Sequence, residues 1–227
     1  MDIQNSVVLI TSAGSSLGAT LASHFAGLGA NVVLSDTDKE VLDSVASRCA
    51  EVSEKVTCYS LPDHSEKSVQ ELLSYIANKF DKGVDVLINY WPSSPLPALT
   101  SGVSGEDFSK MFVSLATPLF NYGQASASQM REFEKNGVIV NILSLCDNKH
   151  LLGFENASSI INGLTKSWAK ELTPFNIRVG GVVPSFSHSA NNDDFSHWSQ
   201  INDELIRNTE YIVSNDYFSG RVVAAEA

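Results

Sequence analysis

The chain has few of the residues on which several classes of protein depend. Its 227 residues include three cysteines, which are odd in number and lack metal-ligand spacing (Cys49, Cys58 and Cys146). We therefore expect no disulfide framework and no metal site, as in a reduced, cytoplasmic protein. Basic side chains are also scarce, because 15 Lys and Arg stand against 26 Asp and Glu, a net charge of −11. This acidity argues against nucleic acid or an anionic membrane as a partner.

Long apolar runs and export signals are missing as well. No apolar run approaches the roughly 18 residues that a membrane-spanning helix needs. The first residues, Met1–Asn5, lack the basic start of a signal peptide. No repeat, low-complexity tract or linker interrupts the chain. The length suits one α/β domain, so we expect a single domain over residues 1–227.

Apolar runs of strand length alternate with helical periods along the whole chain. The runs are rich in Val, Ile and Leu with little alternation, which is typical of parallel strands covered on both faces. They are Val7–Ile10, Val32–Leu34, Val56–Tyr59, Val84–Ile88, Val138–Leu143, Val179–Val183 and Val222–Val223. Between them, apolar residues spaced by three and four predict helices that pack on a sheet, and Thr37–Glu40 has the form of a capping box. We therefore expect an α/β fold, a Rossmann-like, doubly wound, seven-stranded parallel sheet with helices on both faces.

Three stretches carry a family resemblance. They are Val7–Ile10 with the following Thr11–Gly18 (TSAGSSLG), the run Ile160–Leu172 with its Gly-Leu-Thr, and Asn176–Val179. Together they resemble the short-chain dehydrogenase/reductase family along essentially the whole chain. The resemblance implies a nicotinamide dinucleotide cofactor and hydride transfer between nicotinamide and a carbonyl or alcohol carbon.

The resemblance places the cofactor pyrophosphate on the loop after the first strand. The family pattern is Thr-Gly-x-x-x-Gly-x-Gly, and its glycines fall at Ser12, Ser16 and Gly18. A serine in a left-handed conformation costs about 1 kcal/mol, and at Ser16 it would also crowd the ligand. Two outcomes stay open, namely weak NAD(H) binding or a loop that keeps its shape with no ligand. The candidate cofactor residues are Thr11, Ser12, Gly14, Ser16, Leu17, Gly18, Asp36 and Asn89.

Two further positions bear on the cofactor. The resemblance implies that Asp36, at the end of the second strand, accepts hydrogen bonds from the adenosine ribose and favours NAD(H) over NADP(H). The alternative is that Asp36 only opens the turn before the next helix. After the fourth strand, where the family has Asn-Asn-Ala-Gly, this chain has Asn89-Tyr90-Trp91-Pro92. Its two aromatic rings either add bulk on the cofactor path or fill core or a subunit interface.

The catalytic tetrad of the resembled family is largely missing. Counting back from the Gly-Leu-Thr run places Phe154 at its tyrosine and Ser158 at its lysine. Ser114 stands at its asparagine, and Ser144 alone retains the family residue. Phe154 has no acidic proton, and Ser158 has no charge with which to perturb one. General acid–base catalysis contributes about 10²- to 10⁴-fold, so we expect no useful rate of hydride transfer.

Other residues could replace the missing tetrad residues, and a second family has a similar sequence pattern. Six side chains are candidates for catalytic residues at positions that differ from the family's: Tyr90, Tyr122, Cys146, Lys149, His150 and Glu155.

The haloalcohol dehalogenases, which share this fold but have a halide pocket, are similar in the aromatic residues after the fourth strand and in Pro184–His188. They need a Ser-Tyr-Arg triad, which Phe154 and Ser158 also break. This resemblance therefore suggests a lost cofactor more than a gained reaction.

We hypothesise a protein without the catalytic tetrad, acting as a non-catalytic subunit or as a binding protein for a dinucleotide or small ligand. The rival hypothesis is an NAD(H)-dependent oxidoreductase that acts on a carbonyl or alcohol through displaced residues. The resemblance also implies a homodimer or homotetramer, through the helices that hold Ser114–Ala127 and Ile160–Leu172. A mixed assembly with an active relative is the alternative. Small residues near the second helix allow close helix approach (Ala157, Ser158, Ser159 and Gly163).

Overall fold

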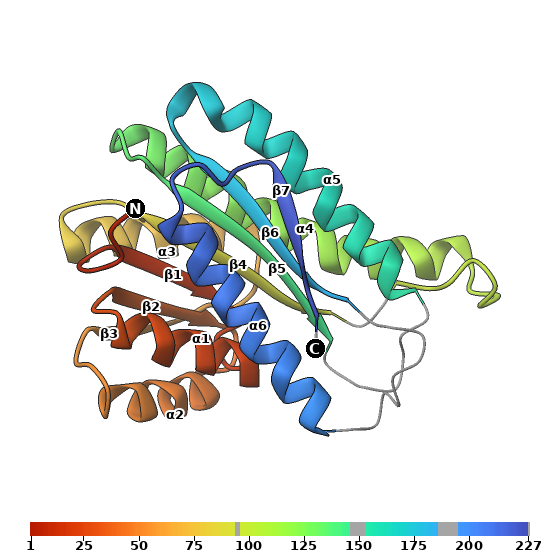
Figure 1. Cartoon of the computed structure of the whole chain (residues 1–227), viewed down its shortest axis with the longest axis horizontal. Coiled ribbons are helices and arrows are strands. Elements are labelled where there is room, and N and C mark those ends of the chain that lie inside the picture. The colour runs from red at the N-terminus through yellow and green to blue at the C-terminus, as the bar shows by residue number, and fades with distance from the viewer. Residues whose placement is uncertain (94–95, 146–152, 186–194, 227) are drawn as a thin grey trace.

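A parallel sheet of seven strands forms the centre of the computed structural model, which describes residues 1–93, 96–145, 153–185 and 195–226 (Figure 1). The strand order is β3-β2-β1-β4-β5-β6-β7, and each neighbouring pair is parallel. The strands are β1 Val7–Thr11, β2 Asn31–Asp36, β3 Val56–Ser60, β4 Val86–Ser93, β5 Val138–Leu145, β6 Arg178–Pro184 and β7 Arg221–Ala225. The order reverses between β1 and β4, so the expected doubly wound fold is confirmed.

Helices cover both faces of this sheet. They are α1 Ser16–Gly27, α2 Lys39–Ala50, α3 Glu66–Phe80, α4 Gly105–Glu132, α5 Phe154–Leu172 and α6 Phe195–Ser214, with a 3-10 turn at Thr173–Phe175. One core cluster joins Val8 and Ile10 to residues of α1, α2 and α6, and another joins Val7 and Leu9 to residues of α3, α4 and α5. Successive strand residues thus enter opposite cores, which explains why the apolar runs do not alternate. No helix in the described ranges is long and apolar enough to cross a membrane.

Two local predictions are wrong. The residue that caps α2 is Asp38 rather than Thr37, and its carboxylate accepts the N–H of Val41 at 3.1 Å. The fourth strand does not end at Ile88, because pairing with β5 carries β4 on to Ser93. Pairing of β4 with β1 stops at Ile88, so residues 89–93 of β4 are hydrogen-bonded to β5 on one side only. Pro92, which has no N–H to donate, is tolerated there because a proline fits a strand with one unpaired side.

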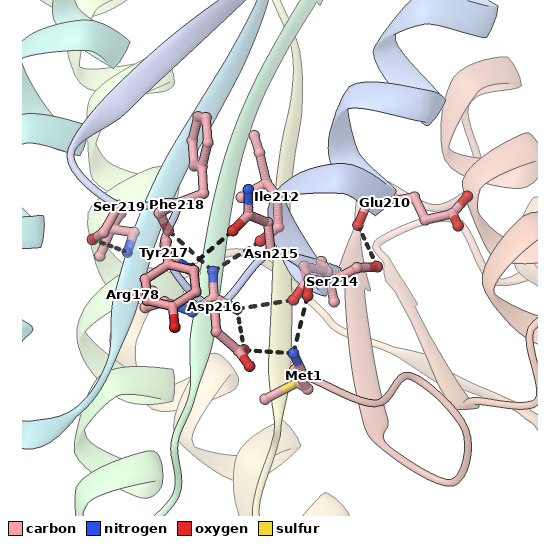
Figure 2. A network of polar contacts seen from close by, with 12 residues as sticks. Met1, Arg178, Glu210, Ile212, Ser214, Asn215, Asp216, Tyr217, Phe218 and Ser219 are labelled. Atoms are coloured by element: carbon pink, nitrogen blue, oxygen red, sulfur yellow. Dashed lines mark hydrogen bonds and ion pairs between the residues drawn. The ribbon is translucent and has the colours of Figure 1, made fainter.

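Arg178 joins the start of β6 to the end of α6 (Figure 2). Its guanidinium donates to the carbonyl oxygens of Ile212 and Val213, both at 2.8 Å, and of Phe218 at 3.0 Å. Asp216 lies 3.7 Å away and also accepts from the amino group of Met1. A half-buried cation therefore satisfies carbonyls that the last turn of a helix leaves without partners.

We predict that Arg178→Met lowers the free energy of unfolding by about 2 to 3 kcal/mol, because it leaves buried carbonyls unsatisfied. The matched control is Arg207→Met, since Arg207 is exposed and, among the described residues, forms an ion pair with Glu204 of its own helix at 2.9 Å. Loss of such a surface pair costs about 0.5 kcal/mol or less. Urea unfolding followed by tryptophan fluorescence measures both values, and equal losses in the two variants would contradict the prediction.

Candidate functional site

Serine residues determine the conformation of the loop between β1 and α1. Ser12 has a φ of +48° and is buried, so the left-handed strain expected of the replaced glycines falls here. Ser16 is the first residue of α1 and does not have a positive φ, so strain at that position is not found. Ser15 caps α1, since its Oγ accepts the N–H of Gly18 at 3.0 Å and donates to the carbonyl of Ser12 at 2.9 Å. A Cβ at Gly18 would lie 2.5 Å from that carbonyl, so this glycine is required.

The N-terminus of α1 keeps two free donors. The N–H groups of Ser16 and Leu17 have no hydrogen-bond acceptor in the described part of the chain, whereas those of Gly18 and Ala19 are both bonded to Ser15. Free N–H groups at a helix N-terminus, together with the helix dipole, form a site for a phosphate or another anion. This end of α1 therefore fits a pyrophosphate despite the serines at two glycine positions.

Asp36 links this loop to the end of β2. Its Oδ2 accepts the N–H of Gly14 at 3.0 Å, and its Oδ1 accepts the N–H of Thr37 at 2.7 Å. A Cβ at Gly14 would meet Asp36 at 3.0 Å and Val41 at 2.9 Å, which explains a glycine at this position. Asp36 thus has the structural role of opening the turn. Each of its oxygens retains a lone pair with which to accept a ribose hydroxyl.

Asn89 and Thr11 face the interior. Asn89 is fully buried, and its Nδ2 donates to Leu119 of α4 at 2.9 Å and to Asn141 of β5 at 3.3 Å. Its Oδ1 is buried without a partner among the described residues. Thr11 donates its hydroxyl to the carbonyl of Tyr90 at 2.6 Å, which joins the ends of β1 and β4. The side chains of Asn89 and Thr11 hold the edge of the sheet together from within.

Sequence reasoning missed a cluster around His64, which lies between β3 and α3. The hydroxyl of Tyr122 lies 3.3 Å from Nδ1 of His64 and 3.1 Å from Oγ of Ser35. The ring of Trp91 packs edge to face with His64, with 4.9 Å between centroids. Burial raises the pKa of Tyr122 well above its ordinary value. The sequence carries no signal for this cluster, because its members belong to four separate segments.

The four tetrad positions hold three serines and a buried phenylalanine. Ser144 is buried near the end of β5, whereas Ser114 is exposed on α4 and donates to the carbonyl of Met111 in its own helix. Phe154 opens α5 with only 2% of its surface exposed. It packs within an apolar cluster of Leu96, Leu115, Leu119, Leu143, Ala157 and Ile161. One turn later, Ser158 has a buried Oγ that finds no partner in the described ranges.

A backbone contact fixes the start of α5. Gly153 precedes the helix with a φ of +90°, and a Cβ there would overlap the carbonyl of Leu96. Asn156 donates its Nδ2 to the carbonyl of Pro97 at 3.1 Å. The segment after β4 is therefore fastened to the first turn of α5, and this contact places Phe154 in its apolar cluster.

The displaced candidates separate in space. The hydroxyl of Tyr122 is hydrogen-bonded to Ser35 of β2. Because β2 lies three strand spacings, or about 14 Å, from β5, this hydroxyl is too far from Ser144 to act as its proton donor. Glu155 is exposed on the first turn of α5. Tyr90 is buried on β4 opposite Ile142 of the adjacent β5. The other candidates, Cys146, Lys149 and His150, lie outside the described residues. No group of three or more potential metal ligands occurs in the residues that are described.

Comparisons with known proteins agree with this geometry. The family model described as "short chain dehydrogenase" matches residues 6–200. A 3-oxoacyl-[acyl-carrier-protein] reductase FabG of Thermotoga maritima is 31% identical over 82% of this chain and 76% of its own. A 3alpha-hydroxysteroid dehydrogenase of Mediterraneibacter gnavus is 29% identical over 83% and 76%. The structure of a 3-ketoacyl-(acyl-carrier-protein) reductase from Brucella melitensis complexed with NADH superposes with a TM-score of 0.79 at 22% identity, covering 99% of this chain and 98% of that one. On the strength of the family match and the identity to the Thermotoga reductase, the chain belongs to the short-chain dehydrogenase family.

Proposed function

We propose that the chain is a non-catalytic member of this family, a subunit or binding protein that takes a dinucleotide at the carboxyl edge of its sheet and prefers NADH to NADPH. The two free N–H groups of Ser16 and Leu17 would hold the pyrophosphate. The carboxylate of Asp36 would accept the ribose hydroxyls and repel a 2′-phosphate. When bound, the nicotinamide supplies a site for hydride exchange. The residues of the chain itself bind and orient the dinucleotide.

One observation carries the non-catalytic part of this proposal. The position expected to donate a proton holds the phenylalanine ring of Phe154, buried within an apolar cluster. No cation stands one turn further on, because Ser158 presents only an unpartnered hydroxyl among the described residues. Among the described residues at the tetrad positions, a substrate oxygen beside Ser144 would therefore find an orienting hydroxyl but no acid or base of matched pKa to exchange a proton.

The second candidate function is an NAD(H)-dependent oxidoreductase that acts on a carbonyl or alcohol. The comparisons favour this function over the first, because the named relatives are reductases and dehydrogenases that match most of the chain. It requires a displaced proton donor. Of the described candidates, Tyr90 is the best placed, since its strand is paired with that of Ser144. The two functions differ in a single property, which is turnover.

The first prediction from this proposal concerns turnover. Purified protein should not reduce 3-oxoacyl thioesters with NADH or NADPH, and should not oxidise hydroxysteroids with NAD+, in assays that follow absorbance of the reduced nicotinamide. The expected rates equal the background without protein. Turnover that Ser144→Ala abolishes would refute the non-catalytic function and establish the oxidoreductase. Its loss in Tyr90→Phe, but not in Tyr75→Phe on α3, would then identify the donor.

The second prediction concerns the cofactor. Calorimetric titration should give a dissociation constant for NADH above about 1 μM, since Ser12 and Ser16 replace glycines, and a weaker one for NADPH. Asp36→Asn should reduce the NADH preference about tenfold, because a neutral amide does not repel the 2′-phosphate. Asp43→Asn, an exposed change on α2, should leave the preference unaltered. A preference for NADPH in the wild-type protein would contradict the role given to Asp36.

We also propose that the chain self-associates through α4 and α5, with a mixed assembly with a catalytic relative as the alternative. Large apolar side chains are exposed on α4, including Phe112, Val113 and Phe120. Phe120 packs against Trp168 of α5, with ring centroids 6.4 Å apart. A Cβ at Gly163 of α5 would meet nothing within 4 Å, so a partner helix has room to approach. A two-fold interface on this face would bury the apolar side chains.

The third prediction tests this association. Sedimentation velocity at micromolar concentration should show a dimer or tetramer for the wild-type protein. Phe120→Asp should shift the population towards monomer, because it places a charge within the apolar face. Tyr217→Asp is the matched control, since Tyr217 is an exposed aromatic residue between α6 and β7 that belongs to neither α4 nor α5. A monomeric wild-type protein, or equal dissociation of both variants, would rule out this interface.

A further inference from the structure

His64 is held from three sides next to the proposed dinucleotide site. Its Nδ1 lies 3.3 Å from the hydroxyl of Tyr122, and Trp91 contacts its ring edge to face. Asn121 donates to its backbone carbonyl at 2.9 Å. The same Tyr122 hydroxyl bonds to Ser35, the residue before Asp36 at the end of β2, and the charge of Asp36 raises the pKa of the imidazole. The ring therefore has a fixed position beside the carboxylate that would meet the adenosine ribose.

Three titratable groups face the imidazole. Asp36 approaches from β2, Asp63 belongs to the same loop, and Tyr122 comes from α4. Hydrogen bonds from Ser65 and Ser68 hold the pKa of Asp63 at about 2, so it stays charged. Burial keeps Tyr122 neutral by raising its pKa. Near neutral pH the variable charge in the group is therefore that of His64.

Burial lowers the pKa of His64, while the charges of Asp36 and Asp63 oppose this shift. The ring is therefore neutral at pH 7, and Asp36 acts on a ligand with its full negative charge. As the pH falls the ring gains a proton, and a positive charge then stands beside that carboxylate. A 2′-phosphate at the ribose would stabilise the same protonated ring.

We propose that His64 determines which dinucleotide the site accepts, by leaving the charge of Asp36 uncompensated when neutral and offsetting it when protonated. The inference rests on the proposed dinucleotide binding. It predicts that discrimination against the 2′-phosphate weakens in acid. A unit positive charge on His64, at an assumed distance of about 6 Å from the 2′-phosphate and with an effective dielectric constant of about 40 to 80, changes the ratio of the NADP and NAD affinities about three- to tenfold.

The test measures dissociation constants of NAD+ and NADP+, which are stable in acid, by calorimetry at about pH 8 and about pH 5, because burial lowers the pKa of His64 below the ordinary histidine value. The ratio of the NADP+ to the NAD+ constant should fall about three- to tenfold further in the wild-type protein than in His64→Gln. The variant is needed because the 2′-phosphate itself titrates near pH 6, and this contribution is common to both proteins. His24→Gln, which changes a histidine of α1 paired with Glu210, should behave as the wild type.

Proton linkage provides a second measurement on the same two proteins. If the 2′-phosphate stabilises protonated His64, NADP+ binding in acid takes up more protons in the wild-type protein than in His64→Gln, in which only the 2′-phosphate contributes. Calorimetry in buffers of different ionisation enthalpy detects the difference. Equal falls in the wild type and His64→Gln, or equal proton uptake by the two proteins on binding NADP+, would overturn the role of His64 and leave dinucleotide binding intact. Failure of both ligands to bind at either pH would overturn the proposed function and this inference together.

Discussion

The early end of the β1–β4 ladder is the constraint on which the site depends. These two strands pair only as far as Ile10 and Ile88, after which β1 turns into the loop before α1 and β4 continues beside β5. The strands part at the point where the order of the sheet reverses, and such a point opens a crevice at the carboxyl edge. One hydrogen bond, from the hydroxyl of Thr11 to the carbonyl of Tyr90, fixes how far they separate. Ser16 begins α1 just beyond this divergence, while Asp36 ends the neighbouring strand β2.

Much of the fold follows from local sequence, whereas the environment of the site does not. Val, Ile and Leu runs located the seven strands, because strands buried on both faces must be apolar throughout. The extension of β4 to Ser93 was missed, since it depends on pairing with β5 rather than on the composition of β4. The contact between His64 and Tyr122 joins residues 58 positions apart, on segments with no shared pattern. Sequence spacing alone placed Phe154 and Ser158 at the tyrosine and lysine positions of the family. Only the structure shows that the Phe154 ring packs among apolar side chains and that the buried Ser158 hydroxyl has no partner among the described residues.

The part of the site that α5 contributes combines apolar packing with unsatisfied polar atoms. Phe154 contributes to a cluster of leucines, while Ser158 and Asn162 have buried oxygens that find no partner among the described residues. Each such oxygen costs about 1 to 3 kcal/mol unless water reaches it. A site shaped only for stability would not retain two of them on one face of α5. Both lie on α5 within about two turns of Phe154, which stands at the position of the proton-donating residue of the family.

The contact between Gly153 and Leu96 has an evolutionary consequence. Backbone atoms on both sides determine where α5 begins, so the side chain at position 154 has little influence on the path of the chain. Tyrosine and phenylalanine differ by one hydroxyl and share the same preferred rotamers. Exchange between them in an ancestral lineage would alter reactivity without passing through a misfolded intermediate. Catalytic capacity is thus free to drift at this position while natural selection acts separately on the scaffold.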